Sequence, residues 1–234
     1  MAIPIKLLSF QGKIIAIDGP AGSGKSTTAR MLANQLGFTY LDTGAMYRAV
    51  ALFALRHSVS FDDENALAQI VAKISIEFQN HPEKGQLVFL NGEDVTDAIR
   101  TPEATEGSSA IAIHPKVREI LVAMQRKMGK NGSIVVEGRD TTSVVFPRAD
   151  LKVYLDADIK VRAQRRFLEA IENGHSTTIE EQIEKLKTRD KNDSNRKASP
   201  LKKVTEAVVV DTTRMSIEEQ VETIIKIAGK KLAG

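Results

Sequence analysis

The sequence has no cysteine and no tryptophan, and only 5% of its 234 residues are aromatic. Without cysteine, the chain can form no disulfide bond, thiolate metal site or cysteine nucleophile. The few aromatic residues do not alternate with basic ones, so no surface for stacking nucleic-acid bases is indicated. The formal net charge is only +3, which fits an anionic ligand but does not by itself indicate a nucleic-acid partner.

Long hydrophobic runs are also lacking, so no segment is predicted to cross a membrane as a helix. Residues 1–10 hold one lysine and an apolar patch broken by Pro4, without the charged start, long apolar centre and cleavage site of a signal peptide. With 42% hydrophobic and 27% charged residues, the composition is that of an ordinary globular protein. We therefore expect a cytoplasmic protein with neither membrane nor nucleic-acid partners.

Short apolar runs alternate along the chain with longer segments of helical periodicity. The predicted strands are 13–18, 39–42, 133–137, 151–156 and 207–211. The predicted helices are 25–36, 45–56, 115–128, 159–172, 179–193 and 216–232. Nearly continuous apolar strands are typical of parallel sheets covered on both faces. The alternation predicts an α/β fold with a doubly wound, five-stranded parallel sheet and flanking helices.

One stretch interrupts this alternation. Between about residues 61 and 105, two short strand-like runs, 74–78 and 86–90, are followed by Asn91-Gly92, a strong hairpin signal, and by a third short run at 93–95. We expect a small β-containing insert at 61–114 in a core formed by 13–60 and 115–234. A polar stretch at about 174–203 is expected to form a lid that excludes water from the site.

The first predicted strand leads directly into Gly19-Pro-Ala-Gly-Ser-Gly-Lys25-Ser26 and then into a helix. This is the G-x-x-x-x-G-K-S phosphate loop in the context that it requires. Glycines let backbone N–H groups approach phosphate oxygens, Lys25 can bridge the β- and γ-phosphates, and Ser26 can ligate Mg²⁺. The alternative is a glycine-rich structural turn, which would leave Lys25 as an uncompensated cation at a helix N-terminus.

Polar residues also follow two other predicted strands, at the edge where parallel sheets bind ligands. Thr43 and Arg48 follow the second strand, and Arg139 and Asp140 follow the third. An arginine fork suits a phosphate, so these residues predict a site for a small anionic acceptor. The alternative for the first pair is that Thr43 is a helix N-cap and Arg48 a surface residue. The alternative for the second pair is that Arg139 and Asp140 form a salt-bridged turn.

Two helices add further charged residues. Arg189, Asp193 and Arg196 are spaced i, i+4, i+7 and would align along one helix, although a solvated face with ion pairs is the alternative. Arg118 lies in the first turn of a helix that Pro115 can open, where a cation opposes the helix dipole. A cation in this unfavourable position, with no evident benefit to the helix, indicates a binding site.

Among phosphate-loop proteins, guanine-specific switches usually carry an N-K-x-D signature, which is absent here. An arginine-rich second site favours a small-molecule kinase over a switch or motor. A kinase of another acceptor, such as UMP or a sugar, and a non-catalytic ATP-binding module remain open.

These motifs together resemble the bacterial cytidylate kinase family from Ile14 to about Leu232. The resemblance is carried by IAIDGPAGSGKSTTAR (15–30), LDTGAMYRA (41–49), NGEDVT with DAIRTPE (91–103), HPKVRE (114–119), EGRD with VVFP (137–147), RDKNDSNRKASPL (189–201) and VVVDTT with SIEE (208–219). The first string is shared by many phosphate-loop proteins, and the second, fourth, fifth and sixth are far more specific. One departure is Thr142, where the family usually has glycine.

The resemblance implies a P-loop kinase that transfers the γ-phosphoryl group of ATP to CMP or dCMP with Mg²⁺, and a nucleotide-binding role for the insert. It implies ATP contacts at Gly19, Pro20, Ala21, Gly22, Ser23, Gly24, Lys25, Ser26 and Thr27. It implies acceptor contacts at Thr43, Arg48, Ser109, Arg118, Arg139, Asp140, Arg189, Asp193 and Arg196. By this resemblance, the cytosine would be surrounded by Ser109, Arg118 and Asp140. The sugar would lie near Arg189 and Asp193. The acceptor phosphate would be held by Arg48, Arg139 and Arg196.

Phosphoryl transfer needs in-line positioning and charge neutralisation more than covalent chemistry. The catalytic charges are expected to come from Lys25, Arg139, Arg189 and Arg196, with Mg²⁺ held through Ser26. Arg162 and Arg165, on the helix after the fourth strand, are further candidate ATP contacts, as lid donors to the charge on the γ-phosphoryl group, with surface helix charges as the alternative. Asp18 or Glu137 could order metal-bound water. We expect the enzyme to work as a monomer.

Overall fold

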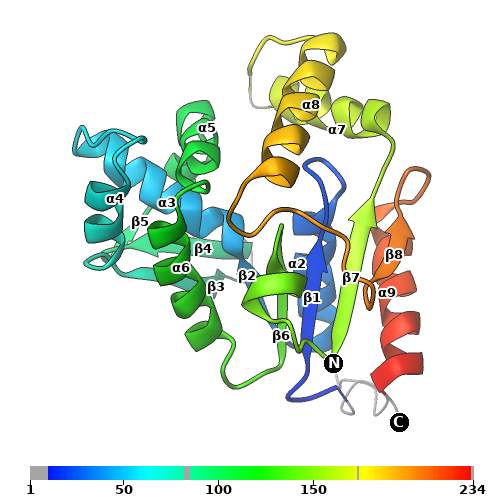
Figure 1. Ribbon diagram of the computed structural model, residues 1–234. Coiled ribbons are helices and arrows are strands. Elements are labelled where there is room, and N and C mark those ends of the chain that lie inside the picture. Colours follow the sequence, from blue (N-terminus) through cyan, green and yellow to red (C-terminus); the bar gives the residue numbers. More distant parts are fainter. Residues whose placement is uncertain (1–9, 82–84, 173, 233–234) are drawn as a thin grey trace. The chain divides into compact units, whose positions relative to one another are not determined.

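The computed structural model describes residues 10–81, 85–172 and 174–232, and the chain divides into two compact units (Figure 1). The first unit comprises the chain up to residue 40 and from residue 131 onward, and the second comprises residues 41–130. Residues 1–9, where no leader was expected, and residues 82–84 of the expected insert lie outside the described residues. The insert predicted at 61–114 falls within the second unit, and its nucleotide-binding role stays a prediction.

The first unit is built on a parallel sheet that, in the described residues, has five strands in the order β2-β6-β1-β7-β8. The central β1 (Ile14–Asp18) pairs in parallel with β6 (Ile134–Gly138) and β7 (Leu151–Asp156), and β7 pairs with β8 (Val208–Asp211). β2 (Thr39–Asp42) crosses the boundary between the units. The predicted α/β fold is confirmed, with strand ends shifted by at most one residue.

One face of this sheet is covered by α2 (Lys25–Leu36) and α9 (Ile217–Leu232). Leu32 of α2 and Ile224 of α9 are fully buried in one apolar cluster with Ile15 and Val153 of the strands. Burial of such side chains is the main stabilising contribution to the unit. Because α2 begins directly after the phosphate loop, the helix end that follows the loop is fixed by this packing.

Two further helices of the first unit, α7 (Ile159–Glu172) and α8 (Ile179–Asn195), pack against each other. Figure 1 shows them beyond the carboxyl ends of β1 and β7. α8 begins with a capping box, in which Thr178 and Glu181 satisfy each other's backbone N–H groups. Ala163 of α7 and Leu186 of α8 form a small apolar cluster with Ala21 of the phosphate loop, so α8 packs onto the loop.

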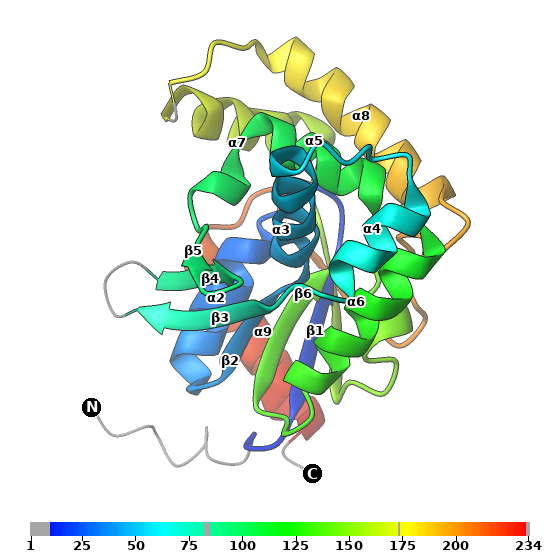
Figure 2. The same ribbon diagram turned by 90° about the vertical axis from the view of Figure 1, so that its left-hand side faces the viewer.

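The second unit contains a small antiparallel sheet of β3 (Ile76–His81), β4 (Gly85–Leu90) and β5 (Glu93–Asp94), visible in Figure 2. The predicted turn between β4 and β5 is confirmed, because Asn91 and Gly92 have φ angles of 52° and 83°. Two consecutive positive φ angles are typical of type I′ hairpins. The first strand lies about two residues later than the pattern predicted.

The helices of the second unit are α3 (Thr43–Arg56), α4 (Glu64–Val71), the short η1 (Ala98–Arg100), α5 (Pro102–Ile111) and α6 (Pro115–Met128). The sequence did not predict α4 or α5. α5 has weak helix propensity because it contains Gly107 and two serines. Its packing compensates: a Cβ at position 107 would collide with the ring of Phe61. Close approach to a neighbouring side chain therefore explains the glycine.

Across the described residues, we find no helix with the length and apolar character needed to cross a membrane.

Candidate active site

The phosphate loop joins β1 to α2, as predicted, and its glycines adopt conformations that other residues rarely reach. Gly22 and Gly24 have φ angles of 78° and 92°. At Gly19 a Cβ would collide with the carbonyl oxygen of Leu155 in β7. The loop therefore needs glycine both for its turns and for its contact with the sheet.

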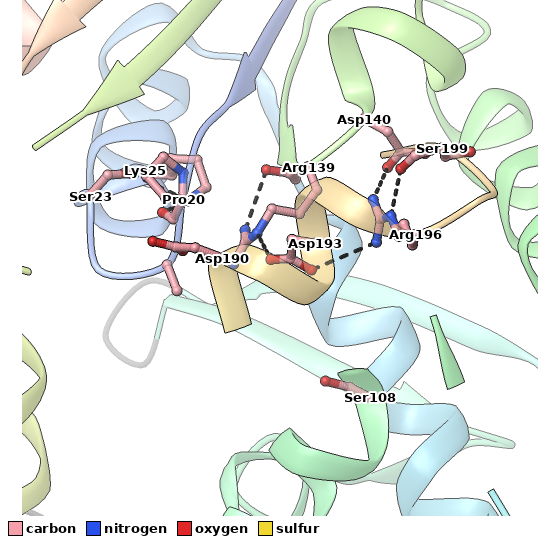
Figure 3. Close-up of polar contacts among 12 residues, drawn as sticks. Pro20, Ser23, Lys25, Ser108, Arg139, Asp140, Asp190, Asp193, Arg196 and Ser199 are labelled. Carbon is pink, nitrogen blue, oxygen red and sulfur yellow. Dashed lines mark hydrogen bonds and ion pairs between the residues drawn. The ribbon is translucent and has the colours of Figure 1, made fainter. Parts of the chain in front are cut away.

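Lys25, the first residue of α2, is only 5% exposed. Its Nζ donates to the carbonyl oxygen of Pro20 at 2.7 Å and to the hydroxyl oxygen of Ser23 at 3.4 Å (Figure 3). Burial, and next the charge of Arg139, hold the pKa of Lys25 well below its usual 10.5, while Glu137 opposes the shift. A bound polyphosphate would supply the missing negative charge.

The hydroxyl of Ser26 donates to Oε1 of Glu137 at 2.7 Å, and the hydroxyl of Tyr40 donates to the same oxygen at 3.3 Å. Glu137 is buried at the end of β6. In the described chain, no group of three or more histidine, acidic or cysteine side chains could hold a metal by itself. A hydroxyl beside one carboxylate nevertheless fits Mg²⁺, which usually binds one or two protein oxygens together with substrate phosphates and water.

Asp18, at the end of β1, is fully buried. Its two oxygens accept four hydrogen bonds of 2.6–2.9 Å, from the N–H and the hydroxyl of both Thr141 and Thr142. Burial raises the pKa of Asp18, and the bonds from the two threonines oppose that rise. Of the two carboxylates considered for ordering metal-bound water, Glu137 is the one that contacts Ser26.

Thr142, where the family usually has glycine, therefore has a defined place. It lies in a π-helical turn, η2 (Thr141–Val145), directly after Arg139 and Asp140. Thr142 is not among the described residues with positive φ, so the side chain is accommodated without backbone strain. Its hydroxyl is one of the donors that fix Asp18.

Five predicted acceptor residues lie in the first unit, and we call them the α8 cluster: Arg139, Asp140, Arg189, Asp193 and Arg196. Arg139 Nε donates to Asp193 Oδ2 at 2.8 Å, and Arg196 Nε donates to the carbonyl oxygen of Ser199 at 2.6 Å. Arg196 also lies 3.9 Å from carboxylate oxygens of both Asp140 and Asp193 (Figure 3). The structure thus brings residues from two distant segments into one charged network.

The side chains of Asp193 and Arg196 are 13% and 5% exposed, so a solvated helix face does not describe them. Burial alone would raise the pKa of Asp193, but the charges of Arg139 and Arg189 outweigh it and hold the pKa below 3.8. Asp193 therefore stays ionised and balances several arginines of the α8 cluster.

The other four predicted acceptor residues, Thr43, Arg48, Ser109 and Arg118, lie in the second unit. Arg48 Nη2 donates to Asp42 Oδ2 at 2.8 Å, and Asp42 also caps α3 by accepting from Ala45 N–H at 2.9 Å. Thr43, in the first turn of α3, is buried. Asp42, which holds Arg48, is a partner that the sequence reasoning missed, although the N-cap position after a strand could have indicated it.

Arg118 is 3% exposed, its guanidinium lies over the ring of Tyr47 at 5.4 Å from the centroid, and Nη1 donates to the carbonyl oxygen of Ala112 at 3.1 Å. A cation–π contact of this kind suits a desolvated arginine. Ser109 is half-buried on α5. Tyr47, in α3, is a second partner that the sequence reasoning did not identify.

Arg162 and Arg165 of α7 contact the phosphate loop itself. Arg162 Nη1 donates to the carbonyl oxygen of Ala21 at 3.1 Å and to Asp190 Oδ2 at 2.8 Å. Arg165 Nη1 donates to the carbonyl oxygen of Gly22 at 3.3 Å. The alternative of surface helix charges does not describe Arg162, whose side chain is 8% exposed.

Comparison with known proteins agrees with this geometry. The family model described as cytidylate kinase matches residues 15–230. A cytidylate kinase of Geobacillus sp. (strain WCH70) is 46% identical, and one of Lysinibacillus sphaericus (strain C3-41) is 45% identical, each over 93% of this chain and 97% of the relative. A crystal structure of an uncharacterized protein from Eubacterium ventriosum ATCC 27560 is similar in fold, with a TM-score of 0.52 and 13% identity, covering 92% of this chain and 97% of that chain.

Proposed function

The chain belongs to the cytidylate kinase family, and we propose on that premise that the loop Gly19–Thr27 binds the ATP from which the phosphoryl group is taken. As a member of this family, the protein is a phosphotransferase that transfers the γ-phosphoryl group of ATP to CMP or dCMP. Lys25 carries the proposal for the loop: it is a buried cation whose hydrogen-bond partners among the described residues are neutral oxygens. A triphosphate provides the charge that this cation lacks.

For the acceptor nucleotide we propose nine contacts. They are Thr43, Arg48, Ser109, Arg118, Arg139, Asp140, Arg189, Asp193 and Arg196. Ser109, Arg118 and Asp140 bind the cytosine, and Arg189 and Asp193 bind the sugar. Arg48, Arg139 and Arg196 bind the acceptor phosphate, because arginine forks match phosphate oxygens. Support comes from the position of these residues in the family motifs and from the burial of Arg118 and Arg196.

The proposal includes Mg²⁺ as the partner of ATP. Ser26 would hold the ion, and Glu137, which accepts the Ser26 hydrogen bond at 2.7 Å, would orient that hydroxyl and the water around the ion. When bound, Mg²⁺ would neutralise charge on the β- and γ-phosphates. Asp18 takes no part in this, because four hydrogen bonds within the first unit occupy its two oxygens.

The chain's own contribution to the reaction is positioning and charge. Lys25, Arg139, Arg189 and Arg196 would stabilise the charge that develops on the transferred phosphoryl group, while the acceptor phosphate is already an anion and needs no general base. Arg162 and Arg165 belong to the ATP site through their contacts with the loop. The segment 174–203, which contains α8, would act as the lid that excludes water.

One experiment separates the proposed function from its two rivals. Release of ADP is measured with ATP, Mg²⁺ and a panel of nucleoside monophosphates and sugars as acceptors. Strong stimulation by CMP and dCMP alone is the expected result. Stimulation by UMP or a sugar instead would identify another small-molecule kinase, and no turnover with any acceptor would identify a non-catalytic ATP-binding module.

Two further parts of the proposal concern the enzyme in solution. We propose that the enzyme is located in the cytoplasm and that it works as a monomer. Light scattering after size-exclusion chromatography, with and without nucleotides, tests the second point. A mass of 25.6 kDa is expected in both cases, and a doubled mass would contradict it.

A further inference from the structure

Three successive carbonyl oxygens of the phosphate loop accept hydrogen bonds from side chains that lie elsewhere in the first unit. Arg162 Nη1 donates to Ala21 O at 3.1 Å, and Arg165 Nη1 donates to Gly22 O at 3.3 Å. The hydroxyl of Thr212, which follows β8, donates to Ser23 O at 2.9 Å. We call Arg162, Arg165 and Thr212 the outer brace.

The outer brace determines where the loop N–H groups point. In a planar trans peptide, the C=O and the N–H of one unit point in opposite directions. A donor on Ala21 O therefore fixes the N–H of Gly22 on the far side, and donors on Gly22 O and Ser23 O do the same for the next two N–H groups. Within residues 10–81, 85–172 and 174–232, the N–H groups of Gly22, Ser23 and Gly24 donate to no protein acceptor.

The brace residues are themselves anchored to regular structure. Arg162 Nε donates to the carbonyl oxygen of Ala157 at 3.0 Å, and its Nη1 is paired with Asp190 of α8 at 2.8 Å. Arg165 Nη2 donates to the carbonyl oxygen of Thr212 at 2.7 Å. A loop with glycines in left-handed conformations has many accessible shapes, and these bonds restrict it to one.

Thr212 connects the brace to the sheet. Its N–H donates to the carbonyl oxygen of Asp156, the last residue of β7, at 2.8 Å. Its hydroxyl hydrogen lies within reach of both Asp156 O, at 3.0 Å, and Ser23 O, at 2.9 Å. Because Asp156 O already accepts the Thr212 N–H, Ser23 O is the acceptor that depends on the hydroxyl. The Thr212 hydroxyl is neutral and fully buried, so Thr212 is not positioned as a phosphate ligand.

We infer that Arg162, Arg165 and Thr212 are positioning residues that hold the phosphate loop with its N–H groups directed at the phosphate site before the nucleotide binds. The inference rests on the proposed binding of ATP at this loop. Arg162 and Arg165 act through the loop and not by touching the transferred phosphoryl group. The energetic gain is preorganisation: the loop needs no rearrangement when ATP or ADP arrives.

The test uses Thr212→Val, which keeps the shape of the side chain and removes the hydroxyl. Dissociation constants for ATP and ADP are measured by calorimetry, together with KM for CMP and the melting temperature. We expect weaker binding of ATP and ADP by the same factor, roughly 3- to 10-fold, with KM for CMP unchanged. The variant loses the bond from the hydroxyl to Ser23 O, at 2.9 Å, and the bond that the hydroxyl accepts from Arg165 Nη1, at 3.2 Å. Thr212→Ser keeps the hydroxyl and should bind like the wild type. Thr205→Val, at an exposed position of the same unit, is the matched control.

Arg165→Met provides the same test if Thr212→Val does not fold. A brace residue should weaken ATP and ADP equally, whereas a direct contact with the γ-phosphoryl group would weaken ATP alone. The double variant Arg165→Met/Thr212→Val should lose less than the product of the single losses, because both residues hold the same turn of the loop.

Thr212→Val with wild-type affinity for ATP and ADP would overturn the inference. So would an Arg165→Met variant that binds ADP normally and ATP weakly. If the wild-type protein itself bound neither ATP nor ADP, the proposed function would fail, which is a different result from either of these.

Discussion

The phosphate loop and the α8 cluster hold positive charge in opposite ways. In the loop, Lys25 is buried against two neutral oxygens, and burial lowers its pKa. In the α8 cluster, Arg139 is paired with Asp193, whose pKa is held low by arginine charges. The loop is thus short of negative charge without a ligand, while the cluster is nearly balanced. We therefore propose that a triphosphate completes the first site, and that an acceptor phosphate would have to draw arginines away from carboxylates in the second.

The largest expected effect comes from removing the unbalanced cation. Lys25→Met should reduce turnover roughly 10³-fold, as loss of a donor to the developing charge does elsewhere. It should also stabilise the ligand-free protein, by about 0.5–2 kcal/mol, because the group removed is a buried cation whose described hydrogen-bond partners are neutral oxygens. Steady-state assays and thermal unfolding measure the two effects.

Lys226→Met, at an exposed position of α9, is the matched control and should change neither quantity. A Lys25→Met protein that is clearly less stable than the wild type would mean that the loop already neutralises this cation, and the contrast with the α8 cluster would disappear.

The next largest effect concerns Arg118, whose charge has a different environment from that of Lys25 or Arg139. Its guanidinium contacts the Tyr47 ring and donates to a backbone carbonyl oxygen. Arg118→Ala should raise KM for CMP by roughly 10- to 100-fold, the loss expected for a hydrogen bond that involves a charged group, and leave ATP affinity within about 2-fold. Kinetics with each substrate varied in turn measure this. Lys127→Ala, exposed on the same helix, is the control. Equal losses for CMP and ATP would remove Arg118 from the acceptor site.

A smaller effect is expected in the α8 cluster, where arginines are paired with carboxylates. Asp193→Asn leaves Arg139 without its ionic partner and should lower the free energy of unfolding by about 1–3 kcal/mol at neutral pH. Because the folded pKa of Asp193 lies below 3.8, its contribution is complete above about pH 3.8 and is lost as the pH falls through the lower folded value.

Denaturant unfolding of the wild type and of Asp193→Asn, from pH 7 to pH 3, measures this difference. The gap between the two stability curves should begin to narrow as the pH falls below about 3.8. Asp62→Asn, an exposed position, should keep the wild-type curve throughout. A constant gap between wild type and Asp193→Asn across the whole range would show that the carboxylate charge is not the cause.

The smallest effect concerns Asp18, a buried anion surrounded by neutral donors and so the counterpart of Lys25 with the sign reversed. Thr142→Gly removes one of its four hydrogen bonds and should cost about 1 kcal/mol of stability, with kcat within a few-fold of the wild type. Thermal unfolding and initial rates are the measurements. A 100-fold loss of kcat with unchanged stability would contradict a supporting role for this hydroxyl.

The sequence predicted the sheet, the phosphate loop and most helices because each rests on a local pattern. The strands are continuous apolar runs, and the loop has fixed spacing around Gly19, Gly24 and Lys25. α5 was missed because its helix depends on packing around Gly107 and not on propensity. Periodicity in the sequence carries no information about such a contact.

Partners separated along the chain could not be predicted in the same way. Spacing placed Arg139 and Asp193 in separate motifs, and only the fold shows that they bond to each other. The contacts of Thr212 with Ser23, and of Thr142 with Asp18, bridge more than a hundred residues. The roles of the acceptor residues remain predictions that rest on the family motifs.

The pairing of β1 with β6 also sets the order in which the protein can fold during synthesis. β1 is made early, but its partner at Ile134–Gly138 emerges only after the whole of residues 41–130. The second unit is one continuous segment, so it can fold while β1 still waits for that strand. Contacts between distant residues form slowly because a long loop must be closed first. Residues 41–130 are therefore synthesised in full before β6 and Thr212, on which the final position of the phosphate loop depends.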